Sequence, residues 1–114
     1  MDRKNKNFKN MDKREALEIA KKYVDSICLK YDVSRAIMFG SYAKGTFHGD
    51  SDIDVAIVIR DIDDIIDTQI DLMKLRRGID FRIEPHPFIL ADFNRANPVV
   101  NEILKSGVEI SLMS

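Results

Sequence analysis

The sequence has 114 residues, of which 45% are apolar and 32% are charged, and its formal net charge is −1. Such a chain is long enough for one domain with a real core, and its composition is typical of a soluble globular protein. The balanced charge gives no general argument for binding nucleic acid or a membrane surface. No apolar run approaches the roughly 20 residues that span a bilayer. A single cysteine, Cys28, excludes an internal disulfide, and a reducing cytoplasm is the expected compartment.

The chain begins with a basic, asparagine-rich stretch, residues 1–10, which we expect to form a frayed tail before a domain of residues 11–114. This stretch lacks the apolar centre of a secretory signal. Asp12 and Glu15 have the spacing of a capping box, so the first helix is predicted to begin there. Apolar residues recur at helical spacing beyond this box, and the helix is expected to end near Lys30.

The first strand is predicted to begin near Arg35 and to end at a glycine–serine turn. Gly40 has no Cβ, so the backbone can turn sharply there and a ligand can approach closely. Ser41 offers a hydroxyl at the start of one predicted helical turn, residues 42–44. The free backbone N–H groups of such a turn favour a phosphate.

The second strand, predicted over residues 52–60, carries Asp52 and Asp54 at its entrance. Because side chains two apart on a strand share a face, both carboxylates should point the same way. The apolar residues between and after them take the other face, against a core: Ile53, Val55, Ile57 and Ile59. Two adjacent carboxylates repel, and a divalent cation between them removes that repulsion. The sequence therefore predicts a hard-metal site beside the phosphate-binding turn.

A second long helix is predicted over residues 61–76, with Gly78 ending it. Acidic residues gather at its start and basic residues at its end, as the helix dipole favours. Its apolar residues repeat at helical spacing and are expected to form the inner face: Ile62, Ile65, Ile66, Ile70 and Met73.

A third strand is predicted over residues 79–84, with Pro85 and Pro87 stopping it. Asn97 and Pro98 have the pattern of a helix start, and the buried face of that last helix is expected to hold Val99, Val100, Ile103 and Leu104. Residues 108–112 can add an edge strand. The fold class is therefore α/β, a small mixed sheet of three to four strands flanked by helices.

Two other kinds of site, a P-loop and a zinc site, do not fit the sequence. Gly40 and Gly45 have the spacing of a P-loop, but Thr-Phe follows in place of Lys-Ser/Thr. The gap between the strands is also too short for the crossover helix of a parallel pair. His48 and His86 have no partner at zinc-ligand spacing, and His86, between two prolines, is expected to be structural.

The pattern Gly40-Ser41, ten residues, then Asp52-Ile53-Asp54 resembles the signature of the nucleotidyltransferase superfamily with the DNA polymerase β-like palm. The short chain resembles the minimal nucleotidyltransferase branch, and the likeness runs from the first helix through residue 84. It implies that Gly40 and Ser41 hold a nucleoside triphosphate, ATP for example, and that Lys44 can contact phosphate. It implies further that Asp52 and Asp54 bind Mg²⁺.

The same resemblance implies a third acid on a following strand. Asp80 is our choice for this catalytic and metal-binding position, because it lies on the polar face of the predicted third strand. It would help to orient or deprotonate the acceptor hydroxyl. Glu84 lies on that same predicted face and is the rival.

The implied reaction is Mg²⁺-dependent transfer of AMP, or another nucleoside monophosphate, to a hydroxyl. Minimal members of the family often stand beside a helical HEPN-type protein in toxin–antitoxin pairs. The resemblance therefore implies an antitoxin that places AMP on a tyrosine of its HEPN-type toxin. Two alternatives stay open: a non-catalytic module that neutralises its partner by contact, and a homodimeric nucleotidyltransferase acting on a small molecule. Neither a nucleic-acid nor a membrane partner is expected.

Overall fold

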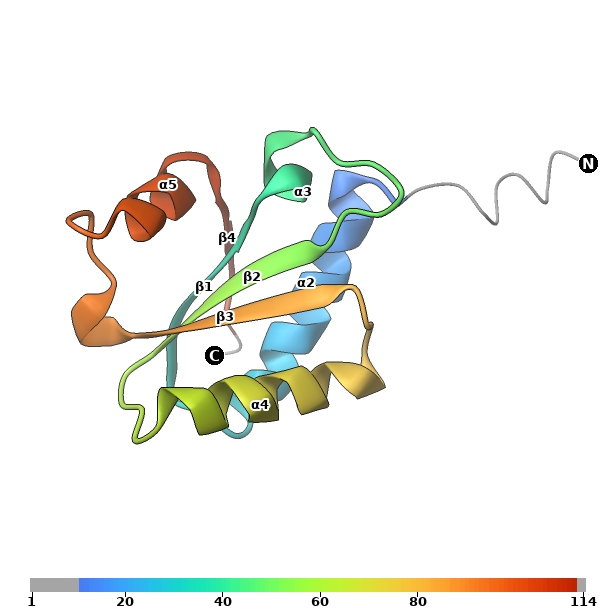
Figure 1. The fold of residues 1–114 in the computed structure, drawn as a ribbon. Coiled ribbons are helices and arrows are strands. Elements are labelled where there is room, and N and C mark those ends of the chain that lie inside the picture. The colour runs from blue at the N-terminus through green and yellow to red at the C-terminus, as the bar shows by residue number, and fades with distance from the viewer. Residues whose placement is uncertain (1–10, 113–114) are drawn as a thin grey trace, which may run out of the picture.

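The computed structural model describes residues 11–112, which form one sheet with helices on both faces (Figure 1). The tail predicted over residues 1–10 lies outside the described residues. The sheet has the strand order β3-β2-β1-β4. Its strands are β1 (Val33–Phe39), β2 (Ile53–Ile59), β3 (Ile83–Ile89) and β4 (Val108–Ile110). Strand β1 runs antiparallel to β2 and β4, whereas β2 and β3 are parallel. The predicted mixed sheet is confirmed, including the edge strand at its C-terminal end.

Helices of different lengths connect the strands. They are α2 (Lys13–Cys28), α3 (Ser41–Lys44), α4 (Ile65–Leu75) and α5 (Pro98–Ser106), with short 3-10 turns η1 (Arg76–Gly78) and η2 (Leu90–Asp92). Helices α2 and α4 cover one face of the sheet, and α5 packs on the other (Figure 1). Within residues 11–112, no helix has the length and apolar character needed to cross a membrane.

The predicted starts of the first and last helices are confirmed, whereas the second long helix begins at Ile65, capped by Asp64, and not at residue 61. The Asp12 side chain accepts a hydrogen bond from the Glu15 backbone N–H at 2.9 Å, and the Glu15 side chain accepts from the Asp12 N–H at 3.1 Å. This reciprocal pair satisfies two amide groups that the first turn of α2 cannot pair internally. Asn97 caps α5 in the same way, accepting from the Val99 N–H at 2.9 Å, with Pro98 in the first turn.

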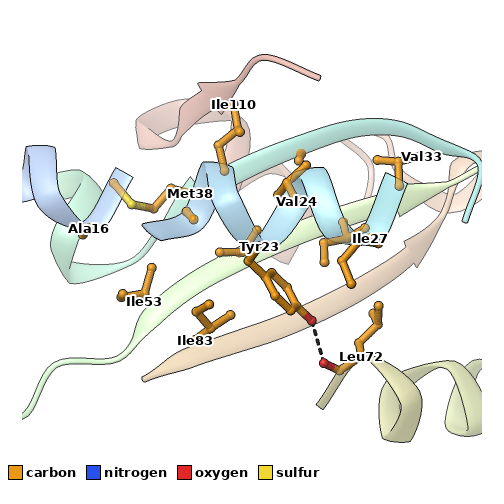
Figure 2. Packing of buried hydrophobic residues seen from close by; sticks show 14 of the residues in the cluster. Ala16, Tyr23, Val24, Ile27, Val33, Met38, Ile53, Leu72, Ile83 and Ile110 are labelled. Carbon is orange, nitrogen blue, oxygen red and sulfur yellow. Dashed lines mark hydrogen bonds between the residues drawn. The ribbon is translucent and has the colours of Figure 1, made fainter. Parts of the chain in front are cut away.

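The main core lies between the sheet and helices α2 and α4 (Figure 2). The apolar side chains of β2 that were predicted to face a core are all buried here: Ile53, Val55, Ile57 and Ile59. Tyr23 of α2 is fully buried among them, and its hydroxyl donates to the Leu72 carbonyl of α4 at 2.7 Å. Burial raises the pKa of Tyr23, so the phenol stays neutral and can keep this hydrogen bond. The bond ties α4 to α2 across the core.

A smaller cluster occupies the opposite face, where α5 packs. Its buried members are Ile37, Ala56, Val58, Phe93, Val100 and Ile103. Side chains alternate along a strand, so Asp54 shares this face with Ala56 and Val58. Asp54 on β2 and Glu84 on β3 are only partly buried, which leaves room for a polar site on this face.

The inner face predicted for the second helix is wrong for Ile65, Ile66 and Ile70, whereas Ile62 packs against the main core. Ile65, Ile66 and Ile70 are 46%, 68% and 49% exposed, and the buried residues of α4 are Thr68 and Leu72. The helix carries apolar residues on two sides, and the spacing alone does not tell which side meets the sheet. In α5 the expected buried face holds for Val100 and Ile103, but Val99 is 57% exposed.

The predicted third strand is also wrong in its bounds. Strand β3 begins at Ile83 and continues through Pro85 and Pro87, which were expected to stop it. It lies at the edge of the sheet, beyond β2. Proline lacks a backbone N–H and is tolerated in an edge strand when that position faces away from the neighbouring strand. Both prolines have the same parity along β3, so neither removes a bond to β2.

Candidate active site

A sharp turn at Gly40 joins β1 to α3. Its φ of 76° and ψ of −153° belong to a region that is essentially restricted to glycine. A Cβ added at Gly40 would lie 2.3 Å from Asp54 Oδ2, so the turn and the carboxylate are in direct contact. Ser41 follows at the start of α3, where backbone N–H groups have no partner within the helix. The predicted helical turn is confirmed, and Asp54 lies against its entrance.

The loop after α3 returns the chain to β2 along a fixed path. Phe47 stacks on the buried ring of Tyr42, with centroids 4.6 Å apart and an interplanar angle of 15°. The Ser51 side chain is buried, and its Oγ accepts a hydrogen bond from the His48 N–H at 2.9 Å. These contacts deliver Asp52, an exposed residue, to the position directly before β2.

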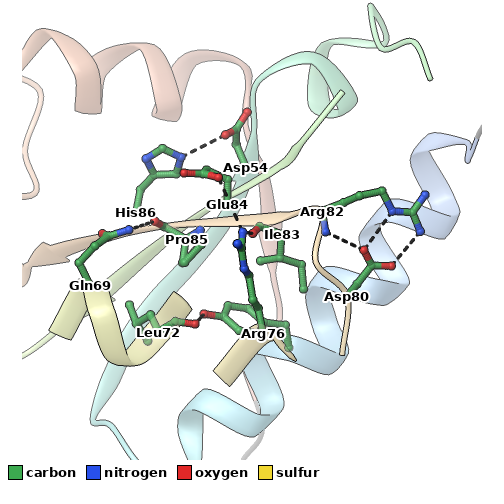
Figure 3. Close-up of polar contacts among 11 residues, drawn as sticks. Asp54, Gln69, Leu72, Arg76, Asp80, Arg82, Ile83, Glu84, Pro85 and His86 are labelled. Carbon is green, nitrogen blue, oxygen red and sulfur yellow. Dashed lines mark hydrogen bonds and ion pairs between the residues drawn. The ribbon is translucent and has the colours of Figure 1, made fainter. Parts of the chain in front are cut away.

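Asp54 lies at the centre of a polar cluster that it forms with Glu84 and His86 (Figure 3). It lies opposite Phe39 of β1 on one side and opposite Glu84 of β3 on the other. His86 Nε2 lies 3.1 Å from Asp54 Oδ1, and in the tautomer with a proton on Nε2 the ring donates to the carboxylate. The His86 ring also meets Phe39 edge-on, with centroids 4.9 Å apart. Asp54 is therefore held between the Gly40 turn and the imidazole.

Two basic side chains near the site each form a long contact with a glutamate. Arg76 Nη1 lies 3.9 Å from Glu84 Oε1 and also donates to the Ile83 carbonyl at 2.8 Å. Lys44 Nζ, on α3, lies 3.8 Å from Glu102 Oε2 on α5. The ammonium is half exposed, so a phosphate near α3 could replace this long contact at small cost.

An apolar groove lies beside Lys44, between the end of β1 and the start of α5. It is lined by Phe39, Pro98, Val99, Glu102 and Ile103. Phe39 thus borders both the groove and the polar cluster, since its ring also contacts His86. A bound molecule that reached the acids could rest its apolar part here.

Asp80 lies apart from this cluster (Figure 3). It sits in the turn before β3 and accepts hydrogen bonds from the Arg82 backbone N–H, Nε and Nη2 at 2.8, 3.0 and 2.8 Å. The Arg82 guanidinium holds the pKa of Asp80 below its usual range. The strand face that favoured Asp80 does not exist, because β3 begins after it. The position opposite Asp54 belongs to the rival, Glu84.

The oxygen donors of Asp52, Asp54 and Glu84 match the ligands that Mg²⁺ prefers. Within residues 11–112, no three His, Cys, Asp or Glu side chains are already gathered closely enough to hold a metal. Mg²⁺ usually binds through one or two carboxylates and completes its shell with water and substrate phosphates. The donor set therefore fits a magnesium ion that arrives with its nucleotide.

His86 is the site residue that the sequence argument missed. It was assigned a structural role because prolines flank it. A usable pattern was present, since Glu84, His86 and Phe88 alternate with apolar or proline residues, as on one face of a strand. Reading that alternation past Pro85 would have placed His86 beside Asp54.

The Gly40–Ser41 turn lies against Asp54, which is paired with Glu84 on a small mixed sheet. This arrangement is that of the palm of a nucleotidyltransferase. The chain belongs to the family described as "Polymerase beta, Nucleotidyltransferase", whose model matches residues 18–112. The match spans the whole described fold except the first turns of α2. The nucleotidyltransferase class and the polymerase β-like palm expected from the sequence are both confirmed.

Individual relatives agree with this family. Over 100 residues the chain is 30% identical to "Putative protein adenylyltransferase MJ0141" of Methanocaldococcus jannaschii, covering 84% of this chain and 99% of the relative. A crystal structure of a nucleotidyltransferase from Sulfolobus solfataricus, itself described as putative, superposes with a TM-score of 0.60 at 20% identity, over 85% and 80% of the two chains. A toxin–antitoxin structure with AMP-PNP gives 0.59 at 21% identity, over 82% and 74%. A mutant of the toxin–antitoxin MntA-HpeT gives 0.53 at 19% identity, over 92% and 76%. At these identities the solved structures establish the shared fold.

Proposed function

We propose that this nucleotidyltransferase moves AMP from ATP to a hydroxyl group of a protein. The acceptor is a tyrosine of a HEPN-type helical toxin, which the chain neutralises. The observation that carries the proposal is the acidic pair, Asp54 and Glu84, in register on neighbouring strands beside the Gly40–Ser41 turn. Carboxylates beside a turn with free backbone N–H groups suit a reaction in which a hydroxyl attacks a phosphate ester.

The turn residues bind the triphosphate in this proposal. The backbone at Gly40 allows close approach, and the Ser41 hydroxyl and the first N–H groups of α3 donate to phosphate oxygens. Lys44 exchanges Glu102 for a phosphate. Asp52, Asp54 and Glu84 would hold Mg²⁺. When bound, the ion would neutralise the triphosphate and stabilise the charge that develops at the α-phosphorus.

Glu84 takes the third acidic role in place of Asp80. The acceptor oxygen forms a bond to the α-phosphorus while the bond to the leaving pyrophosphate breaks, and the hydroxyl proton passes to Glu84. His86 acts through Asp54, because its Nε2–H fixes Oδ1 and leaves Oδ2 at the Gly40 turn. It is a positioning residue, since its contact is with the carboxylate.

The acceptor is inferred from the relatives. The Methanocaldococcus jannaschii protein, almost all of which aligns with this chain, is named as an adenylyltransferase that acts on protein. Two of the structural neighbours are toxin–antitoxin proteins, and one of those structures has AMP-PNP. These likenesses support a partner of the toxin class and an adenine nucleotide as the donor.

The direct test is adenylylation of a co-expressed HEPN-type partner. The purified chain, the partner, ATP and Mg²⁺ should give a partner heavier by whole AMP units in intact-mass measurements, with the label on tyrosine. Asp54→Asn and Glu84→Gln should abolish the gain. Asp50→Asn is the matched control, because it removes a nearby exposed carboxylate of the loop without touching the acidic pair.

Other outcomes point to other functions. Neutralisation of the partner by Asp54→Asn as complete as by the wild type, with no gain in mass, would favour the non-catalytic binding module. Label that appears on a small molecule and never on protein would favour the small-molecule enzyme. Either result would refute the adenylylation of a partner.

A further inference from the structure

The outer face of α4 exposes more apolar surface than a solvated helix needs. Ile66 and Ile70 are 68% and 49% exposed, and Met73 continues the same stripe at helical spacing. Phe81, 67% exposed, lies beside the C-terminal end of this stripe, where it lines a shallow pocket with Ile70 and Met73. We call the surface formed by Ile66, Ile70, Met73 and Phe81 the α4 face. Exposed apolar groups that gather in this way usually mark an interaction surface.

The spacing of the stripe matches a helix-pairing seam. Ile66, Ile70 and Met73 of α4 follow one another by four and three positions, the a/d spacing of paired helices. Asp67 and Lys74 both flank this seam on the same side, one near each end of α4. Neither side chain forms an ion pair within residues 11–112, so both charges are available to a partner.

We propose that the α4 face is the interface of a symmetric dimer, in which α4 pairs antiparallel with α4 of a second copy. Asp67 lies three residues before Ile70 and Lys74 lies four residues after it, both on one side of the seam. A twofold axis at Ile70 therefore places the acidic start of one helix against the basic end of the other. Asp67 then meets Lys74 of the second copy twice, once on each side of the axis. This self-complementary charge pattern selects a second copy as the occupant.

The proposed dimer is independent of the catalytic assignment. Helix α4 packs on the sheet face that holds the main core, whereas Asp54 lies on the α5 face (Figure 1). Pairing through α4 leaves both polar clusters and both grooves beside α5 open. Loss of the dimer can therefore be told apart from loss of transfer, because each is measured without the other.

Sedimentation velocity of the purified full chain over a concentration series tests the proposal. The wild type should pass from monomer to dimer, and Ile70→Asp should raise the dimer dissociation constant at least about tenfold, because it buries a charge at the axis. Val99→Asp is the matched control: Val99 is 57% exposed on α5, which packs on the opposite face of the sheet from α4, so the dimer should persist. Far-ultraviolet circular dichroism checks that each variant is folded.

Charge reversal and cross-linking test the antiparallel geometry. Asp67→Lys or Lys74→Asp alone should weaken the dimer, and the two together should restore it, because the pair is exchanged within each contact. Ile70→Cys should form an intermolecular disulfide, since the axis brings residue 70 against its own copy, whereas Ile66→Cys should not. A wild type that stays monomeric to about 1 mM would overturn the proposal and leave the face to a different partner. A dimer that Ile70→Asp does not weaken would overturn it as well.

Discussion

Replacement of Gly40 by alanine tests whether the turn and Asp54 form one unit. At φ 76° and ψ −153° an alanine is strained, which costs about 1–3 kcal/mol. The added Cβ would also lie 2.3 Å from Asp54 Oδ2, so the carboxylate must move. We therefore expect Gly40→Ala to lower the free energy of unfolding and, separately, to abolish nucleotide binding at the displaced acid.

Gly45→Ala is the control, because both glycines have a positive φ but differ in ψ and in their surroundings. Gly45 has φ 80° and no heavy atom within 4 Å of an added Cβ. Its substitution should cost about 1–2 kcal/mol from the left-handed conformation alone. Nucleotide binding by Gly45→Ala should stay close to that of the wild type.

Denaturant titration gives both unfolding free energies, and calorimetry with ATP and Mg²⁺ gives the binding. The double variant Gly40→Ala with Asp54→Ala isolates the collision, because only the backbone strain then remains and the cost of Gly40→Ala in this background should fall to about 1–3 kcal/mol. If Gly40→Ala binds nucleotide as well as Gly45→Ala and costs no more stability, the contact between the turn and Asp54 has no functional role.

Three further predictions concern the acids and His86. Glu84→Gln should reduce transfer by at least about 100-fold, whereas Asp80→Asn should leave the turnover near wild type; a steady-state transfer assay that reversed this ranking would return the third role to Asp80. Arg82 holds the pKa of Asp80 below its ordinary 3.8, so the ionised carboxylate stabilises the fold above that pH and the contribution is lost as pH falls through the lower folded-state pKa. In urea titrations the stability advantage of the wild type over Asp80→Asn should therefore shrink below about pH 4. His86→Leu should weaken Mn²⁺-dependent nucleotide binding by about 10–100-fold, and His86→Gln, which keeps an N–H donor, should weaken it less; equal losses would make the role of His86 one of packing.

Local rules predicted the parts of the fold whose signals lie within a few residues. The capping box at Asp12, the Asn97–Pro98 helix start and the Gly40–Ser41 turn all depend on contacts between near neighbours, and the structure has each of them. The alternation after Asp52 also sufficed, because one face of β2 meets the main core along its whole length. These segments carried the family signature as well.

Helix α4 shows where periodicity fails. Its isoleucines repeat at helical spacing, but the residues that meet the core are Thr68 and Leu72. Which face turns inward depends on the Tyr23 hydroxyl, which bonds to the Leu72 carbonyl, and on the position of β3 below the helix. Neither contact can be read from the spacing within α4, because both partners are distant in sequence.

The bounds of the third strand were wrong because the prolines were taken as the end of a strand, although their position explains how β3 presents Glu84 and His86. Ile53 N–H donates to the Arg82 carbonyl at 2.8 Å, so even-numbered residues of this segment turn their backbone toward β2. Pro85 therefore points outward, where its carbonyl accepts from Gln69 of α4 at 3.1 Å. The Ile83 carbonyl, also outward, accepts from Arg76. Gln69 of α4, Arg76 of η1 and the two prolines thus cover the outer edge of β3.

Closing this edge also fixes the register on which the site depends. A slip of one residue along β2 would turn the opposite set of β3 side chains to the α5 face and remove Glu84 from Asp54. Prolines resist such a slip, because it would bring a residue without an N–H to face β2. The same rigidity holds His86 at Asp54 Oδ1. The two prolines, which were expected to end the strand, therefore help to align Asp54 with Glu84. Their effect follows from the position of β3 at the edge of the sheet, which cannot be read from the local sequence.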